Sequence, residues 1–422
     1  MEQKFRIYGD TEISLKSLLF QLLILTICIS LSIFNKQFVY ATFAITVFTG
    51  LLNKNKYVFC QLFFLLPFTV IYKLSPESSS FFAYLLLVIS FFLVARYKLK
   101  LVILLPISIY TLLGLCDNLT MWIKLMSGWV LLIYFIKYAN TNLVKYVSLS
   151  SSIGLIISSI WGLVKFDIPQ LANYINEGNS EYMMGERIER FSGLYYDPNY
   201  YSLSVAMTLY MILYFGVSNN LDKKVAFPIA AILLCFGALS YSKMFFFVAF
   251  YILVILLKNM IFYSKNKIRL IIIITMVLFF CFPLFLESNY MLNFMDRFTT
   301  RDFSSGRFTL IEIYMTYILS NFDVLMFGRG IGGEIVGTHV PHNTFVEILY
   351  FLGIIGTIIY ITTLCKIFSY NKLIKHKTPM NYSLFIVFCF MIGSLCMLTM
   401  NDFMFLLMLL WFSLNIDFKM KK

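Results

Sequence analysis

Apolar stretches long enough to cross a lipid bilayer recur along the whole chain, and most are separated only by short polar breaks. Each stretch is continuously hydrophobic, which predicts membrane-spanning α-helices; a β-barrel would show short segments of alternating polarity. The spans are expected near residues 16–34, 38–53, 57–73, 80–95, 101–116, 121–137, 146–164, 198–217, 225–239, 243–262, 269–286, 344–366, 383–400 and 403–417. Because several spans are short, the all-α fold is expected to have about 12–14 crossings.

Composition favours the same class of protein. Hydrophobic residues make up 60% of the 422 positions, and the mean hydropathy of +0.81 excludes an ordinary soluble domain. No small-residue cleavage site follows the first apolar run, so we expect a retained first span and a single integral membrane domain over residues 1–422. The eight cysteines lie in or at the ends of apolar runs, which favours buried thiols over disulfides or a metal site.

The formal net charge of +13 follows the predicted topology. Lysines and arginines concentrate in the two tails and in the loops on the same side as the N-terminus, such as Lys54/Lys56 and Lys375/Lys377. This is the positive-inside pattern, and it predicts cytoplasmic N- and C-termini. The charge is therefore explained without a nucleic-acid partner.

Arginines depart from this pattern in the only two long loops of the predicted topology. These loops, residues 165–197 and 287–343, are expected to be non-cytoplasmic, and they contain Arg187, Arg190, Arg297, Arg301, Arg307 and Arg329. A guanidinium offers a planar fork of donors that suits phosphate and carboxylate, and it stays charged in a low-dielectric site. Long loops that keep such residues against the topology rule are expected to be functional.

The first long loop ends in GERIERFSGLYYDPNYYSLSVAM. Asp197 is expected to cap the next helix, with Pro198 at its first position and Asn199 facing the loop. Four tyrosines surround this entry: Tyr195, Tyr196, Tyr200 and Tyr201. An aromatic belt at the membrane interface explains most of them, and a platform on which sugar rings stack is the alternative.

The second long loop contains apolar residues at helical spacing from Arg307 to Met326, which predicts an amphipathic helix in the membrane surface or against the bundle. Ser304 or Ser305 is expected to cap it. Arg307 then lies in the first turn, where a cation is unfavourable for the helix dipole. The GRGIGG stretch at 328–333 follows no strand, so it is no dinucleotide motif; we expect a flexible turn, with an anion-binding backbone nest as the alternative.

The stretch VPHNTFVEILYFLGIIG places His342 and Asn343 at the expected cap of a membrane helix. A helix N-terminus attracts anions, and its field lowers the pKa of a nearby histidine, which favours the neutral imidazole that accepts a proton. An interfacial capping histidine explains His342 equally well. Gly353 and Gly356 are expected to permit close helix contact. His339 is the weaker candidate.

The predicted non-cytoplasmic face therefore combines fixed cations, one candidate base and aromatic rings at the lipid–water boundary. This inventory suits a polyanionic, lipid-anchored substrate. The external carboxylates are scattered and form no Asp-x-Asp pair, so we expect a metal-independent reaction without a cofactor, in which arginines stabilise a leaving phosphate.

The motifs also resemble a known family, the O-antigen polymerase and O-antigen ligase superfamily of bacterial surface-polysaccharide assembly. The resemblance rests on the order and spacing of RFSGLYYDPNYYSL (190–203), LSYSKMFFFVA (239–249), SSGRFTLIEIY (304–314), FGRGIGG (327–333) and HNTFVEILYFLGIIG (342–356). It covers roughly the C-terminal 60% of the chain. It implies a polytopic, GT-C-like glycosyltransferase that uses a lipid-phosphate donor.

The resemblance also implies roles for single residues. Arg190 and Arg307 would hold the diphosphate of an undecaprenyl-diphosphate-linked oligosaccharide, and His342 would act on the acceptor hydroxyl. The further substrate-binding candidates are Arg187, Tyr196, Asn199, Lys243, Arg301 and Asn343. Lys243 stands where the family usually has arginine, so it keeps the charge and loses the donor fork.

The family resemblance leaves two enzymes open. A polymerase joins lipid-linked repeat units, whereas a ligase moves the glycan to lipid A core or to a protein; the number of spans and the composition favour the polymerase by analogy. The expected location is the bacterial plasma (inner) membrane, with membrane lipid, a flippase and a chain-length regulator as candidate partners. A flippase or other transporter is the alternative outside the enzymes, but internal repeats and charges in mid-membrane are lacking.

Overall fold

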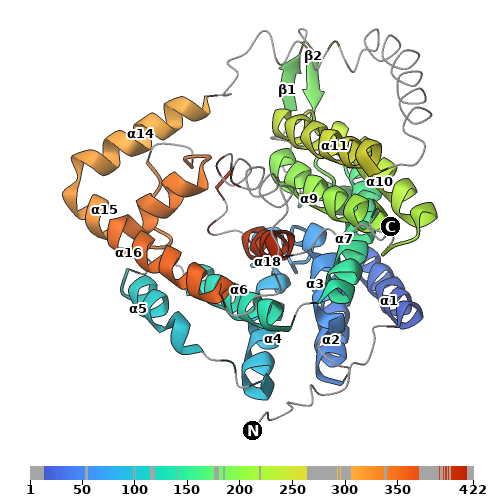
Figure 1. Cartoon of the computed structure of the whole chain (residues 1–422), viewed down its shortest axis with the longest axis horizontal. Helices are drawn as coiled ribbons and strands as arrows, with labels where there is room; N and C mark the ends of the chain where they lie inside the picture. Colours follow the sequence, from blue (N-terminus) through green and yellow to red (C-terminus); the bar gives the residue numbers. More distant parts are fainter. Residues whose placement is uncertain are drawn as a thin grey trace.

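The computed structural model describes residues 14–52, 56–97, 99, 101–114, 119–138, 140–174, 180–183, 186–217, 220–263, 292, 295, 306–336, 340–369, 389, 393, 395–396, 398 and 401–415. Helices make up most of this part (Figure 1). Among the described residues, five helices are long and apolar enough to cross a membrane, and five shorter apolar helices accompany them. By length and composition, these are the helices of a helical membrane protein. The total of 12–14 crossings stays a prediction.

The five long helices are α1 (Leu15–Phe34), α6 (Leu119–Tyr138), α7 (Thr141–Leu163), α9 (Pro198–Val217) and α16 (Thr344–Phe368). The other helices of the predicted spans are α2 (Gln37–Leu52), α3 (Lys56–Leu65) with the 3-10 turn η1 (Leu66–Phe68), α4 (Phe81–Tyr97), η2 (Leu101–Leu104) with α5 (Leu105–Leu113), α10 (Lys223–Ala238), α11 (Lys243–Tyr263) and α18 (Asn401–Asn415). The predicted spans agree with most of these bounds within a few residues. The span predicted at 269–286 and most of 383–400 lie outside the described residues.

The helix α1 illustrates how these segments suit a bilayer. Leu18 and Ile29 on one face are fully buried, whereas Phe20 and Leu23 on the other are 63% and 56% exposed. Both faces are apolar, so the exposed face would be unfavourable in water and is favourable against lipid.

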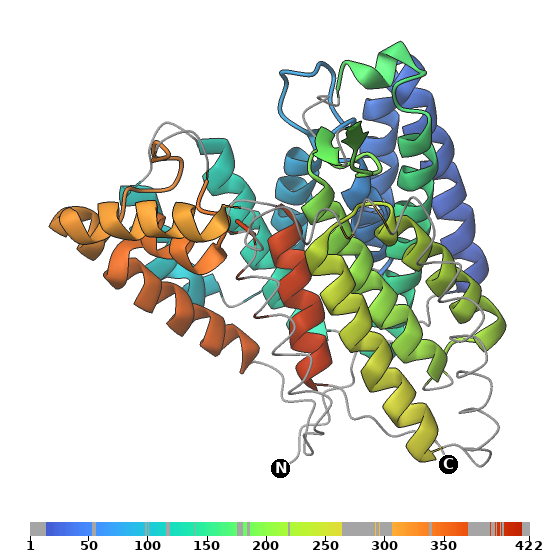
Figure 2. The same cartoon turned by 90° about the horizontal axis from the view of Figure 1, so that it is seen from above.

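The described helices form a large bundle and a smaller group beside it. In the bundle, α9 packs against α7, α10 and α11, and α3 packs against α7. The smaller group consists of α5, α14 (Arg307–Ser320), α15 (Phe322–Phe327) and α16, and it lies apart from α1, α7, α9 and α10 in both views (Figures 1 and 2). Between them stands α18, which packs on α6 and on α9. The two predicted long loops thus end on different parts of the protein.

The span predicted over 344–366 is present as α16, but its helix is interrupted by a kink. Gly353 has φ +63° and ψ −174°, a conformation open essentially to glycine alone. The break leaves backbone carbonyls without helical partners, and other segments supply donors. Arg329 N–H and Gly330 N–H donate to the carbonyl oxygens of Tyr350 and Phe351 at 2.8 and 3.0 Å.

The second long loop differs from expectation at both ends of its helix. The helix predicted from Arg307 to Met326 is two helices, α14 and α15, which are separated at Asn321. Its N-cap is Gly306, with φ +77° and no side-chain hydrogen bond, so neither Ser304 nor Ser305 occupies the capping position. The expected inner face is confirmed by the burial of Tyr314 and Ile318.

The first long loop holds the only strands of the described part, and the sequence analysis did not predict them. A short helix, α8 (Pro169–Ala172), precedes the antiparallel strands β1 (Ser180–Met183) and β2 (Glu186–Glu189). Arg190 directly follows the last residue of β2.

Candidate functional site

Arg190 is a buried anchor at the end of the first long loop, with 5% of its surface exposed. Its Nε donates to the carbonyl oxygen of Ser240 at 3.1 Å, and its Nη2 donates to Asn199 Oδ1 at 2.9 Å. The Ser242 hydroxyl donates to the same Asn199 oxygen at 3.4 Å. Arg190 therefore connects the loop to the first turn of α9 and to the turn between α10 and α11. Two predicted site residues, Arg190 and Asn199, are in direct contact.

The entry of α9 is capped as predicted. The helix begins at Pro198, and the Asp197 carboxylate accepts a hydrogen bond from Asn199 N–H at 2.6 Å. Proline loses nothing at this position because the first N–H of a helix has no helical partner. The cap fixes Asn199 where it meets Arg190.

The four tyrosines around this entry have different surroundings. Tyr195 and Tyr201 are buried, and their hydroxyls bond to Ser204 at 3.1 Å and to Ser159 at 2.7 Å. The aromatic-belt interpretation is therefore wrong for these two, because their rings pack inside the protein. Tyr196 is 63% exposed and stays a candidate surface for a sugar ring.

Arg307 is the first residue of α14, as predicted, and it is partly buried. Burial lowers the pKa of its guanidinium, the Asp197 carboxylate raises that pKa, and the Arg190 guanidinium lowers it. The last two effects require Asp197 and Arg190 to lie near Arg307, although 110 or more residues separate them in sequence. Arginines from the two predicted loops thus lie close enough for their charges to interact, near the cap of α9.

His342 and Asn343 begin the first half of α16. Asn343 is the N-cap, and its Oδ1 accepts from Phe345 N–H at 3.0 Å and from Val346 N–H at 3.1 Å. His342 precedes the helix with φ +47°, a left-handed conformation that is uncommon for residues other than glycine. The capping oxygen comes from Asn343, so the histidine side chain is not the cap.

A buried segment joins the entries of α9 and α16. We call it the strap and define it by Leu395, Cys396 and Leu398, which are at most 3% exposed. From α9, the Tyr200 hydroxyl donates to the Cys396 carbonyl oxygen. From α16, the Thr344 hydroxyl donates to the Leu395 carbonyl oxygen at 2.5 Å.

The strap also relates His342 to Arg307. The Cys396 sulfur lies against the backbone N–H groups of His342 and Asn343, and the Arg307 guanidinium lies near this thiol. His342 before the start of α16 and Arg307 at the start of α14 therefore both lie near Cys396 of the strap.

The other predicted substrate-binding residues are less central. Lys243 is the first residue of α11, directly after Ser242 of the Arg190 cluster. Arg187 lies in β2 opposite Tyr182 of β1. Arg301 lies outside the described residues.

The GRGIGG stretch is not the flexible turn that its composition favours. Gly328, with φ +79°, packs so closely on the α16 break that an added Cβ would lie 2.4 Å from the Phe351 carbonyl oxygen. The Tyr110 hydroxyl of α5 donates to the Phe327 and Leu352 carbonyl oxygens at 2.8 and 2.7 Å. The stretch stabilises the broken helix, which gives its glycines a structural role.

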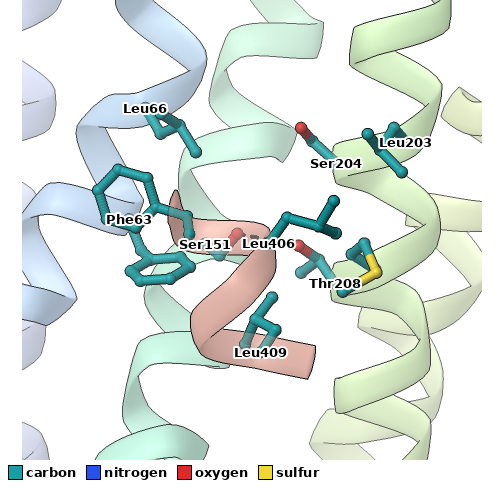
Figure 3. A pocket seen from close by; sticks show the side chains of 10 residues that line it. Phe63, Leu66, Ser151, Leu203, Ser204, Thr208, Leu406 and Leu409 are labelled. Atoms are coloured by element: carbon teal, nitrogen blue, oxygen red, sulfur yellow. Dashed lines mark hydrogen bonds between the residues drawn. The ribbon is translucent and has the colours of Figure 1, made fainter. Parts of the chain in front are cut away.

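A cavity further along α9 is too small for the site's substrate. It is lined by Phe63, Leu66, Ser151, Leu203, Ser204, Met207, Thr208, Phe405, Leu406 and Leu409 (Figure 3). The hydroxyls of Ser151 and Thr208 are 2.9 Å apart. Its volume of about 30 Å³ is that of a few water molecules.

No protein-family model, no curated protein and no solved structure matches this chain. The resemblance to the O-antigen polymerase and ligase superfamily therefore stays a prediction from the motifs. Within the described part, no group of three or more His, Cys, Asp or Glu side chains could hold a metal ion.

Sequence reasoning missed Glu347 as a part of this site, and it considered Tyr200 only as one of the tyrosines around the entry of α9. Glu347 is 3% exposed, and its Oε2 accepts a hydrogen bond from the backbone N–H of Leu398 at 2.9 Å. The available clue was a lone carboxylate one turn inside an apolar helix, where burial is costly without a partner. The partners of Glu347 and Tyr200 are backbone groups of the strap, so no residue pattern indicates them.

Proposed function

We propose that this protein is a bacterial O-antigen or capsular polysaccharide polymerase of the plasma membrane. It joins undecaprenyl-diphosphate-linked oligosaccharide repeat units on the non-cytoplasmic face, in a metal-independent glycosyl transfer. The observation that carries the proposal is the approach of Arg307 to Arg190 beside the entry of α9. The Asp197 carboxylate balances one of these two positive charges, and a ligand with several negative charges, such as a diphosphate, would offset the repulsion between the guanidiniums more fully.

The chemistry follows from this charge arrangement. The acceptor hydroxyl oxygen forms a bond to the anomeric carbon of the donor, and the bond from that carbon to the diphosphate oxygen breaks. The electron pair leaves with the lipid diphosphate, where Arg307 and Arg190 stabilise the growing negative charge without reorganising. The hydroxyl proton passes to the imidazole of His342, which lies beyond the N-cap of α16.

The surrounding residues support the positions of these groups. Asn199 holds Arg190, and Asn343 fixes the start of α16 behind His342. Tyr196 offers an exposed ring on which a sugar can stack. Arg187, Lys243 and Arg301 are further candidates for contacts with the donor phosphates. The positive-inside charge pattern supports cytoplasmic termini, and with them a site on the opposite face.

The surface-glycan profile of a strain that lacks this gene tests the proposal, with the restored gene as control. A polymerase predicts exported glycan that stops at one repeat unit. Full-length chains stranded on undecaprenyl diphosphate would instead indicate the ligase. Repeat units trapped on the cytoplasmic side would indicate a flippase, and an unchanged profile would contradict all three assignments.

A further inference from the structure

Glu347 occupies a place where several elements meet. Its carboxylate lies near the hydroxyls of Tyr314 on α14 and Tyr360 on the second half of α16, and near the thiol of Cys396, since its charge acts on all three. Its Oε2 accepts from Leu398 N–H at 2.9 Å. One buried side chain on the first turn of α16 is therefore bonded to the strap and lies near α14 and the second half of α16.

The strap is held from two sides. Thr344 and Glu347, both buried on the first turn of α16, bond to Leu395 and Leu398. Between these two positions, the carbonyl oxygen of Cys396 accepts a hydrogen bond from the Tyr200 hydroxyl of α9. All of these bonds involve the backbone of the strap, so they fix the course of its chain. These bonds therefore join the entries of α9 and α16 through one segment of the chain.

We propose that Glu347 is a positioning residue: through the strap, it sets His342 at the start of α16 against Arg190 and Arg307 near the start of α9. The effect of Glu347 on catalysis rests on the proposed function, whereas the hydrogen bonds that hold the strap are independent of it. A positioning role needs an acceptor for the Leu398 N–H and not a negative charge. Glutamine keeps such an acceptor, and leucine, of similar size, does not.

The first test measures the strap without any assay of activity. In a variant whose only cysteine is Cys396, the rate of reaction with a small thiol reagent is compared in membranes. Cys396 is 3% exposed, so slow labelling is expected in the parent and in Glu347→Gln.

Glu347→Leu leaves the Leu398 N–H unpaired. Labelling should then be faster by about tenfold, the effect of about 1.4 kcal/mol in a local opening equilibrium. Glu312→Leu, an exposed carboxylate on α14, is the control and should behave as the parent.

Tyr200→Phe tests the strap from the α9 side and does not depend on whether Glu347→Leu folds. It removes one hydroxyl from the Cys396 carbonyl and should also speed labelling. Cys396 that stays as protected in Glu347→Leu and Tyr200→Phe as in the parent would overturn the proposal.

The second test measures turnover and donor binding of the purified proteins with an undecaprenyl-diphosphate-linked oligosaccharide. Glu347→Gln should turn over at near the wild-type rate. Glu347→Leu should lose about a hundredfold in turnover, the loss that a misplacement of about 1 Å can cause, with donor affinity retained. An inactive Glu347→Gln would overturn the proposal, because charge would then be required. An inactive wild type would refute the proposed function, and the labelling rates would still decide the role of the strap.

Discussion

At the residue scale, the site contains two residues, Arg307 and His342, that are unfavourable in their local backbone positions. Arg307 stands at a helix N-terminus that disfavours cations, near a second arginine. His342 adopts a left-handed backbone conformation that glycine would adopt more easily. Residues that persist against local preference are expected where function requires their side chains.

The left-handed backbone of His342 allows a test of whether its imidazole acts as a base or the residue has only a structural role at the membrane interface. His342→Gly relieves a left-handed conformation that costs a side chain about 1 kcal/mol, so the thermal unfolding midpoint should stay the same or rise. If the imidazole takes part in proton transfer, glycosyl transfer should fall by about 10²–10⁴-fold. His376→Gly, in the loop predicted to be cytoplasmic, is the control. Full activity in His342→Gly would show that the imidazole has no part in the reaction.

The site residues differ in how far the sequence could predict them. Arginines in long loops on the unfavoured side of a membrane are conspicuous, which is why Arg190 and Arg307 could be selected. Their proximity could not be read from the sequence, because Arg307 follows Arg190 by 117 positions and hydrogen bonds to Asn199 and Ser240 position Arg190. The strap could not be predicted, since backbone groups of Leu395, Cys396 and Leu398 make its bonds.

At the element scale, the apolar runs predicted where the helices lie. They did not predict the break in α16, which occurs at a glycine. The run that forms α16 is uniformly hydrophobic, so nothing in its composition marks a break. Gly353 is compatible with close helix packing, as predicted, and also with the left-handed conformation that it adopts. The hairpin β1–β2 is short and stands among polar residues, where no hydrophobic alternation indicates a strand.

The break in α16 predicts a large cost for a small substitution. A Cβ at Gly353 would lie 2.5 Å from Gly328 N and 2.6 Å from the Met326 carbonyl carbon, in a backbone conformation that alanine disfavours. Gly353→Ala should therefore destabilise the protein by about 3 kcal/mol or more, measured as a lower unfolding midpoint in detergent.

Gly306→Ala is the matched control for this clash. Gly306 also has a positive φ, but nothing lies within 4 Å of a Cβ added there. This substitution should cost only the strain of about 1 kcal/mol. Equal destabilisation of the two variants would mean that close packing of Gly353 against the 326–328 segment contributes nothing.

At the scale of the whole molecule, the two groups of helices meet at the site. Arg190 and Asn199 belong to the large bundle, whereas Arg307 and His342 belong to the smaller group with α5, α14, α15 and α16 (Figure 1). The strap, which contacts both α9 and α16, crosses this boundary. A site assembled in this way depends on the relative position of the two groups, which explains why a buried bond distant from the arginines is expected to matter.

The most direct test of the central claim is glycosyl transfer by the purified protein in lipid nanodiscs. The substrate is an undecaprenyl-diphosphate-linked repeat unit, and its joining into longer lipid-linked chains is followed by gel or mass spectrometry.

The wild type should extend the unit without added metal. Arg307→Ala and Arg190→Ala should form no product, and Arg307→Lys should be poor because it loses the bidentate fork. Arg329→Ala is the control; Arg329 lies beside Glu334, 4.0 Å away, and should be dispensable. Near-normal extension by both alanine variants at the site would contradict the account.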